Sequence, residues 1–182
     1  MTPFAFVPTR RQATLALLSA GLLAGCASRS PKPAPSARSA PPARTSGRGL
    51  NLHPSQREAV VAHTMLLVNT PYTYGGNTPQ GGFDCSGLIQ YVLRQVAGPQ
   101  QALPRTTAQW AAASTPVPQT RLQRGDLVFF NTTGKPYSHM GLYVGDGQFV
   151  HAPSTGGIVR KASLSNRYFA PRYLGARRVF AA

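Results

Sequence analysis

One cysteine of this chain stands where a nucleophile could be activated. Cys85 lies in Asp84-Cys-Ser-Gly87, directly after a stretch rich in Gly, Pro and Asn. An apolar stripe at helical spacing follows, which predicts that Cys85 begins a helix with Asp84 near its N-cap. The unpaired N–H groups of a helix N-terminus favour an anion, so we expect a lowered thiol pKa and hydrogen bonds for an oxyanion. A buried structural cysteine is the alternative, but flanking Asp84 and Ser86 fit a nucleophile better.

The base for such a nucleophile must be one of four histidines. His53 lies at the edge of the folded region and His63 in a predicted helix, so surface or packing roles are expected for both. His139 and His151 begin and end a predicted β-hairpin, and neighbouring strands can place both imidazoles on one face. We interpret His139 as the base and His151 as the residue that orients it. These histidines and Cys85 could also ligate zinc, although we expect neither a metal nor a cofactor.

The elements that must position these residues change from helices to strands along the chain. A capping-box pattern, Ser55-Gln-Arg-Glu58, precedes apolar positions at helical spacing and predicts a helix over 55–69. Two further helices are expected, from Cys85 and after Thr106, and residues 70–82 are expected to be loop. Short β-like runs then cover 126–130, 140–144, 148–152, 157–161 and 176–180. Helices followed by an antiparallel sheet predict an α+β fold.

Six segments of the chain form an informative series. They are Tyr72-Thr-Tyr-Gly-Gly76, Gly82-Phe-Asp-Cys-Ser-Gly-Leu88, Leu103-Pro-Arg-Thr106, Gly125-Asp-Leu-Val-Phe129, Ser138-His-Met-Gly-Leu-Tyr143 and Phe149-Val-His-Ala152. In this order they resemble the NlpC family of papain-like cell-wall peptidases. The resemblance implies a helix bearing the nucleophile, packed on a small antiparallel sheet, and hydrolysis of peptide bonds in peptidoglycan. It assigns Cys85 as nucleophile, His139 as base and His151 as the third polar residue. Gly125 and Asp126 look like turn residues, and no chemistry is assigned to them.

The same resemblance implies four residues that bind substrate. Tyr72 matches a tyrosine close to the nucleophile that positions substrate or stabilises the oxyanion. Asp84 and Ser86 flank Cys85 and line the groove in relatives, whereas pure helix capping is the alternative for Asp84. Arg105 could hold a carboxylate of the stem peptide, or it could be a structural arginine.

The N-terminal residues resemble the leader of a bacterial lipoprotein. Two arginines precede an apolar run over 13–24, which is too short to span a bilayer. Leu23-Ala-Gly-Cys26 then resembles a lipobox, where the leader is cut and the cysteine is lipidated. We expect a signal peptide over 1–25 and lipid on Cys26, which leaves Cys85 without a disulfide partner. An ordinary secretory signal is the alternative.

Composition divides the remaining chain into a tether and one domain. Residues 26–49 are rich in Ser, Pro, Ala and Arg without an aromatic residue, which is typical of a disordered tether. Residues 50–182 suffice for a single domain, in which twelve Lys or Arg outnumber four Asp or Glu. A basic balance can indicate nucleic acid, but the export signal and the lack of a lysine-rich run argue against it.

Together these features predict a monomeric peptidoglycan endopeptidase held to the cell envelope by lipid on Cys26. The alanine that follows Cys26 is compatible with the outer membrane of a Gram-negative bacterium, facing the periplasm. Two alternatives remain open. One is a non-catalytic lipoprotein that binds peptidoglycan, and the other is an amidase or acyltransferase on the same scaffold.

The first testable prediction is that Cys26 becomes the lipid-modified N-terminus of the mature protein. The leader and the Leu-Ala-Gly-Cys tetrapeptide lead to this expectation. Mass spectrometry of the N-terminal peptide should find Cys26 acylated. Cleavage at another residue, with an unmodified thiol at position 26, would contradict the prediction.

Overall fold

The computed structural model describes residues 50–181. The expectations about the signal peptide, the lipid on Cys26 and the tether concern residues 1–49 and lie outside the described residues. Among the residues that are described, no helix is long and apolar enough to cross a membrane.

The first helix, α1 (Arg57–Leu66), follows a 3-10 turn, η1 (Pro54–Gln56). The predicted capping box, from Ser55 to Glu58, is wrong because other residues form it. The His53 side chain accepts from the Ser55 amide, and the Gln56 side chain accepts from the His53 amide, so the box caps η1 instead. The helix also ends earlier than expected, because Asn69 adopts a left-handed conformation with φ of 75°.

The second helix, α2 (Cys85–Ala97), begins at Cys85 as predicted. Asp84 is its N-cap and accepts from the Gly87 amide at 2.6 Å, and Gly98 ends it with φ of 78°. The third helix, α3 (Thr107–Ala112), follows Thr106 as predicted and has a complete capping box between Thr106 and Gln109.

A six-stranded antiparallel sheet follows, in the order β3-β8-β4-β5-β6-β7. The strands are β3 (Thr115–Val117), β4 (Leu127–Phe130), β5 (His139–Gly145), β6 (Gln148–His151), β7 (Arg160–Ser163) and β8 (Tyr173–Arg178). The 3-10 turns η2 (Gln119–Arg121) and η3 (Ala170–Arg172) precede β4 and β8. The α+β prediction is confirmed, but β3 was not predicted, and β1 (Asn77–Thr78) pairs with β2 (Gly82–Phe83) partly within the expected loop.

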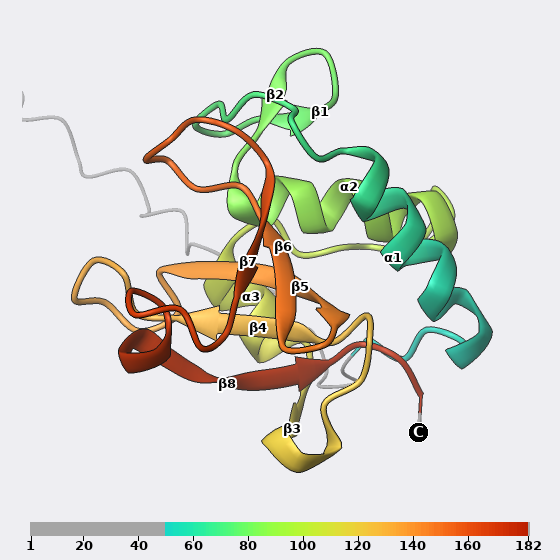
Figure 1. Ribbon diagram of the computed structural model, residues 1–182. Helices are drawn as coiled ribbons and strands as arrows, with labels where there is room; N and C mark the ends of the chain where they lie inside the picture. Colours follow the sequence, from blue (N-terminus) through green and yellow to red (C-terminus); the bar gives the residue numbers. More distant parts are fainter. Residues whose placement is uncertain (1–49, 182) are drawn as a thin grey trace, which may run out of the picture. The chain divides into compact units, whose positions relative to one another are not determined.

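Each face of the sheet carries its own apolar core, because side chains alternate along a strand. Figure 1 shows α1 and α2 on one side of the sheet. Met140, Leu142 and Val150 belong to the larger core together with the helices. Phe149, with Phe169, belongs to a second cluster on the other side. Side chains of β5 and β6 that project from the same face of the sheet as Phe149 therefore point away from the helical core.

Asp126 closes a turn, as the sequence suggested, because its amide donates to the Gln123 carbonyl at 3.0 Å, but its side chain also has a structural role. Its side chain is fully buried and accepts two hydrogen bonds at 2.7 Å from Arg178, which lies on β8. Arg57 of α1 lies within 3.4 Å, and the Gln123 amide donates at 2.8 Å. The carboxylate thus links three elements: α1, β8 and the turn before β4. A turn pattern alone could not reveal the distant partners. Gly125 does occupy a turn, with φ of 86°.

Replacing Asp126 by Asn should therefore destabilise the protein. The change leaves the charges of Arg178 and Arg57 without their partner, a loss that typically costs about 3 kcal/mol or more. The matched control is Glu58→Gln, which removes the exposed ion pair with Arg124 and should cost less than about 1 kcal/mol. Urea unfolding at neutral pH measures both free energies. Equal losses in the two variants would contradict this account.

Candidate active site

Cys85 lies where the helical layer meets the sheet. It is the first residue of α2, it is partly exposed, and it packs against the larger core. The backbone N–H of Met140, the residue after His139, interacts with the thiol, as do those of Ser86 and Cys85 itself. The start of α2 therefore lies beside the start of β5. No hydrogen bond joins the Cys85 sulfur to the His139 ring in this structure, although both residues are described.

The thiol pKa is raised, not lowered as expected for a helix N-terminus. Burial is the largest cause and the negative charge of Asp84 the second, and together they raise the pKa of Cys85 to about 11. The backbone N–H groups of Met140 and Ser86 oppose the increase without cancelling it. The expectation was wrong because it considered the helix alone and omitted desolvation and the neighbouring carboxylate. In the resting site the thiol is therefore protonated at neutral pH.

The two predicted histidines meet on one face of the β5–β6 pair. His139 Nε2 lies 2.8 Å from His151 Nδ1, and both side chains are buried. Gly141 stands between them in sequence, and a Cβ there would crowd the Phe149 ring and His151. The absence of that side chain gives His151 the room to reach His139. The hairpin register thus places the rings as the sequence reading expected.

Burial also determines the charge of this pair. It lowers the pKa of His139 to about 4. It lowers the pKa of His151 to about 3, with smaller contributions from His139 and Arg160. Both rings are therefore neutral at pH 7. A neutral His139 can accept a proton, and because Nε2 faces His151, the nitrogen available for it is Nδ1.

The same contact bears on the zinc alternative. The two nitrogens that face each other at 2.8 Å are hydrogen-bonded to one another, and zinc between them would need each about 2.0–2.1 Å from the metal along diverging directions. Among residues 50–181, no three His, Cys, Asp or Glu side chains gather as a metal site would require. The facing nitrogens of His139 and His151 are thus oriented toward one another and not toward a shared ion in this structure.

A glycine-rich loop covers the start of α2. Added Cβ atoms at Gly76 and Gly87 would collide with the backbone of Gly82 and Gly76, respectively. The loop and helix therefore pack backbone against backbone. Tyr72 precedes this contact in sequence and lies near the Cys85 thiol. Burial raises the pKa of Tyr72, and the charges of Cys85 and Asp84 raise it further. Its hydroxyl thus remains protonated and able to donate a hydrogen bond.

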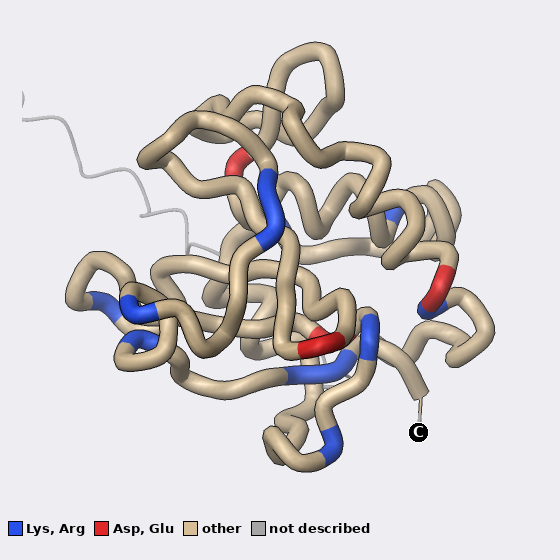
Figure 2. Tube along the Cα trace, viewed as in Figure 1, with Lys and Arg blue, Asp and Glu red and all other residues tan. Residues whose placement is uncertain are grey.

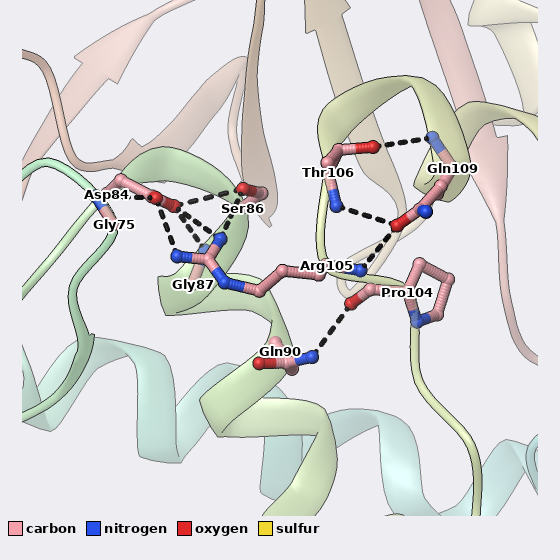
Figure 3. A network of polar contacts seen from close by, with 9 residues as sticks. All are labelled: Gly75, Asp84, Ser86, Gly87, Gln90, Pro104, Arg105, Thr106 and Gln109. Atoms are coloured by element: carbon pink, nitrogen blue, oxygen red, sulfur yellow. Dashed lines mark hydrogen bonds and ion pairs between the residues drawn. The ribbon is translucent and has the colours of Figure 1, made fainter. Parts of the chain in front are cut away.

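Three residues predicted to bind substrate are bound to one another (Figure 3). Arg105 donates to both carboxylate oxygens of Asp84, at 3.1 and 2.8 Å, and to the Ser86 hydroxyl at 2.9 Å. The amides of Gly75 and Gly87 also donate to Asp84. Burial raises the pKa of Asp84, but the hydrogen bonds from Arg105, Gly87 and Ser86 outweigh it and lower that pKa. This network holds the loop, the helix start and the Arg105 segment together beside Cys85.

Some residues that shape the site were missed in the sequence. Gly141 and Gly87 matter through the space they leave, and both lie inside segments quoted above for other residues. The amide of Met140 acts through its backbone, which no side-chain pattern can indicate. Arg160 influences His151 across a strand pairing, and only the register of β6 and β7 brings these two residues together.

Comparisons with known proteins found similar chains and structures. A family model described as the NlpC/P60 family matches residues 69–178. Murein DD-endopeptidase MepH of Escherichia coli is 39% identical over 129 residues, which are 68% of this chain and 47% of that protein. Probable endopeptidase NlpC of the same organism is 38% identical over 166 residues, which are 91% of this chain and 97% of that protein. The chain spans about half the length of MepH and a third of LytE from Bacillus subtilis.

Solved structures share the fold. The NlpC/p60 domain of the peptidoglycan hydrolase SagA has a TM-score of 0.56 and 36% identity, covering 66% of this chain and 97% of that domain. A Staphylococcus aureus protein described as similar to a lipoprotein of the NLP/P60 family has a TM-score of 0.61 and 29% identity. That match covers 76% of this chain and 46% of the other.

The buried histidines should make the fold sensitive to acid. An unfolded histidine has a pKa of about 6.5, and the folded values are lower, so the unfolded chain binds more protons as the pH falls. Stability is therefore complete above about pH 6.5 and is lost as the pH falls toward the folded pKa values. For His139 alone the loss is on the order of 3 kcal/mol by pH 4.

Urea unfolding between pH 7.5 and 4 measures this effect. The double variant His139→Gln with His151→Gln lacks both groups and should show a flatter dependence on pH, whatever its stability at pH 7. Parallel curves for the two proteins would contradict the assignment of the acid effect to these histidines.

Proposed function

Since this chain belongs to the NlpC/P60 family, we propose that it is a cysteine endopeptidase that hydrolyses peptide bonds in peptidoglycan. The observation that carries the proposal is the contact of His139 with His151 beside the start of α2, where Cys85 lies. The names of MepH as a murein DD-endopeptidase and of SagA as a peptidoglycan hydrolase support the substrate class.

Cys85 is the nucleophile and His139 is the base. Because the thiol and the ring are both neutral at rest, the thiol proton moves to His139 Nδ1 as sulfur attacks the scissile carbonyl. His151 accepts the Nε2–H of His139, so it keeps Nδ1 free for that proton and stabilises the imidazolium that forms. Hydrogen bonds at a buried site act strongly, which makes this pairing effective.

The oxyanion forms next to several donors. The backbone N–H groups of Cys85, Ser86 and Met140 interact with the Cys85 sulfur, so they would lie close to the carbonyl that the sulfur attacks. The Tyr72 hydroxyl adds a neutral donor. Donors held in place before the reaction stabilise the developing charge without reorganising. Asp84, Ser86 and Arg105 hold these donors in position and form a polar wall beside the nucleophile.

Collapse of the tetrahedral intermediate completes the first half of the reaction. The carbon–nitrogen bond breaks, His139 gives its proton to the departing amine, and a thioester to Cys85 remains. A water molecule then attacks the thioester, with His139 taking its proton and returning it to the sulfur. The products are a carboxylic acid, an amine and the original thiol.

The remaining parts of the proposal concern the place of action. Lipid on Cys26 would hold a domain of residues 50–182 at the cell envelope through the 26–49 tether, with the outer membrane of a Gram-negative bacterium as the expected site. The leader pattern supports this, as does the description of the Staphylococcus aureus neighbour as similar to a lipoprotein. We expect the protein to act as a monomer without a metal or cofactor.

Hydrolysis of purified peptidoglycan tests the mechanism. Cys85→Ala should abolish product release, and His139→Ala should lower kcat/KM roughly 100- to 10,000-fold because the base and proton donor are lost. His151→Ala should be milder, since it removes only the orienting partner. The control is His53→Ala, an exposed histidine at η1, which should retain wild-type activity.

Each outcome has a distinct reading. Mass spectrometry of the released fragments identifies which bond breaks, and loss of a sugar–peptide amide or transfer to an acceptor would indicate the amidase or acyltransferase alternative. Wild-type turnover by Cys85→Ala, or loss with EDTA and recovery with zinc, would refute the cysteine mechanism. Binding to peptidoglycan without release of any fragment would favour the non-catalytic lipoprotein.

A further inference from the structure

A cavity of about 370 Å³ opens beside His139. Its walls come from the β4–β5 loop, the β6–β7 loop and the segment before β8, which gather on the left in Figure 1. The lining residues are Thr132, Pro153, Ser154, Thr155, Arg160, Asn166, Tyr168 and Phe169, together with His139. Cys85 does not line it. The cavity therefore adjoins the base rather than the nucleophile.

This position corresponds to one side of the scissile bond. The acyl part of a substrate becomes bonded to the Cys85 sulfur, whereas the departing amine takes its proton from His139. The residue that carries this amine must therefore rest against His139. A cavity lined by His139 and not by Cys85 is therefore a candidate for the leaving side.

The orientation of Arg160 follows from the strand register. Arg160 is the first residue of β7 and pairs with His151 of β6. Side chains directly opposite one another in an antiparallel pair project from the same face of the sheet. Arg160 thus shares a face with the histidine pair, while its neighbour Lys161 pairs with Val150 and projects from the other face.

The guanidinium of Arg160 has no protein partner within the described part of the chain. Of the four acidic residues there, Glu58, Asp84 and Asp126 are paired with other arginines. The fourth, Asp146, lies in the β5–β6 turn. Figure 2 shows Lys and Arg but no Asp or Glu along the loops around the cavity.

Neighbouring residues hold the walls of this cavity in place. The Arg160 guanidinium lies against Gly156, where a Cβ would approach its Nη1 to 2.8 Å. Tyr168, another lining residue, is held by Arg172, whose guanidinium carbon lies 4.2 Å from the centre of the Tyr168 ring and which donates to the Tyr168 carbonyl at 2.8 Å. The Tyr168 amide also donates to Asn166 at 2.8 Å. The cavity therefore joins a fixed aromatic wall to an unpaired cation.

We propose that this cavity binds the residue on the leaving side of the scissile bond and that Arg160 recognises a free carboxylate of that residue. A guanidinium pairs with a carboxylate through two parallel hydrogen bonds, and Arg160 has no competing acceptor. Diamino acids of stem peptides offer two sources, the carboxylate next to the scissile nitrogen and a distal one. The inference rests on the proposed function, because it needs His139 to protonate the leaving amine.

Three synthetic substrates separate the sources. In the first substrate the leaving residue is diaminopimelic acid, which has both carboxylates. In the second it is the monoamide that lacks the carboxylate beside the scissile nitrogen. In the third it is lysine, which lacks the distal carboxylate. Each is made with γ-linked D-Glu and with D-Ala on the acyl side. The wild-type protein should prefer diaminopimelic acid over one of the other two by roughly 10- to 100-fold in kcat/KM, as expected for charge-assisted hydrogen bonds. A poor monoamide substrate would identify the carboxylate beside the scissile nitrogen, and a poor lysine substrate would identify the distal one.

Variants then test the residue. Arg160→Gln should bring this ratio close to one, mainly by raising KM for the preferred substrate, and Arg160→Lys should restore part of it. Lys161→Gln removes an adjacent positive charge from the opposite face and should keep the wild-type ratio. A purely structural role of Arg160 would lower activity on all three substrates equally.

Two results would overturn the inference. If the wild-type protein cleaves whole peptidoglycan but treats the three substrates alike, the inference fails while the proposed function stands. The same holds if Arg160→Gln keeps the wild-type ratio. If neither peptidoglycan nor any of the substrates is cleaved, the proposed function fails and the inference fails with it.

Discussion

The hydrogen bonds of Asp84 are the interaction on which the rest of the site depends. One carboxylate caps α2, binds the Gly75 amide of the loop, and pairs with Arg105 from the segment before α3. Three pieces of chain therefore converge on the residue before Cys85. The same carboxylate opposes formation of a thiolate at Cys85. Arg105 offsets part of that negative charge. The arginine therefore both holds its segment of chain in place and weakens the effect of Asp84 on the thiol.

The sheet determines the charge state of His139, the proposed base. His139 and His151 are buried beside aromatic rings, and burial keeps them neutral at neutral pH. A neutral thiol beside a neutral imidazole separates no charge until a substrate arrives. In the proposed mechanism, charge then develops during attack, next to donors that the fold has already placed. We therefore attribute reactivity to placement of the pair rather than to a free thiolate in the resting protein.

The two arginines near the site differ in what surrounds them. Arg105 is engaged by Asp84 and Ser86, so its charge is largely satisfied within the protein. Arg160 has no such partner among the described residues and lines a cavity beside His139. The polar wall near the nucleophile is thus internally paired, whereas the side near the base presents an unpaired cation.

The sequence alone determined the elements that local signals specify. Asp84 and Gly98 bound α2 through an N-cap and a left-handed C-terminal residue, and Thr106 with Gln109 caps α3, because capping involves residues a few positions apart. Short β-like runs indicated the strands, and the Gly-Asp-Gly segment at 145–147 indicated the turn of the hairpin between His139 and His151. The α+β order and the family motifs could therefore be read without coordinates.

Only the tertiary structure decided what depends on distant residues. The burial of Asp126 against Arg57 and Arg178, the raised pKa of Cys85 and the position of Arg160 beside His151 all arise from contacts between separate elements. Desolvation and strand register are properties of the packed sheet and helices. Local sequence patterns do not encode them, because a hydrogen-bonding residue looks the same in a pattern whether its partner lies next to it or across the fold.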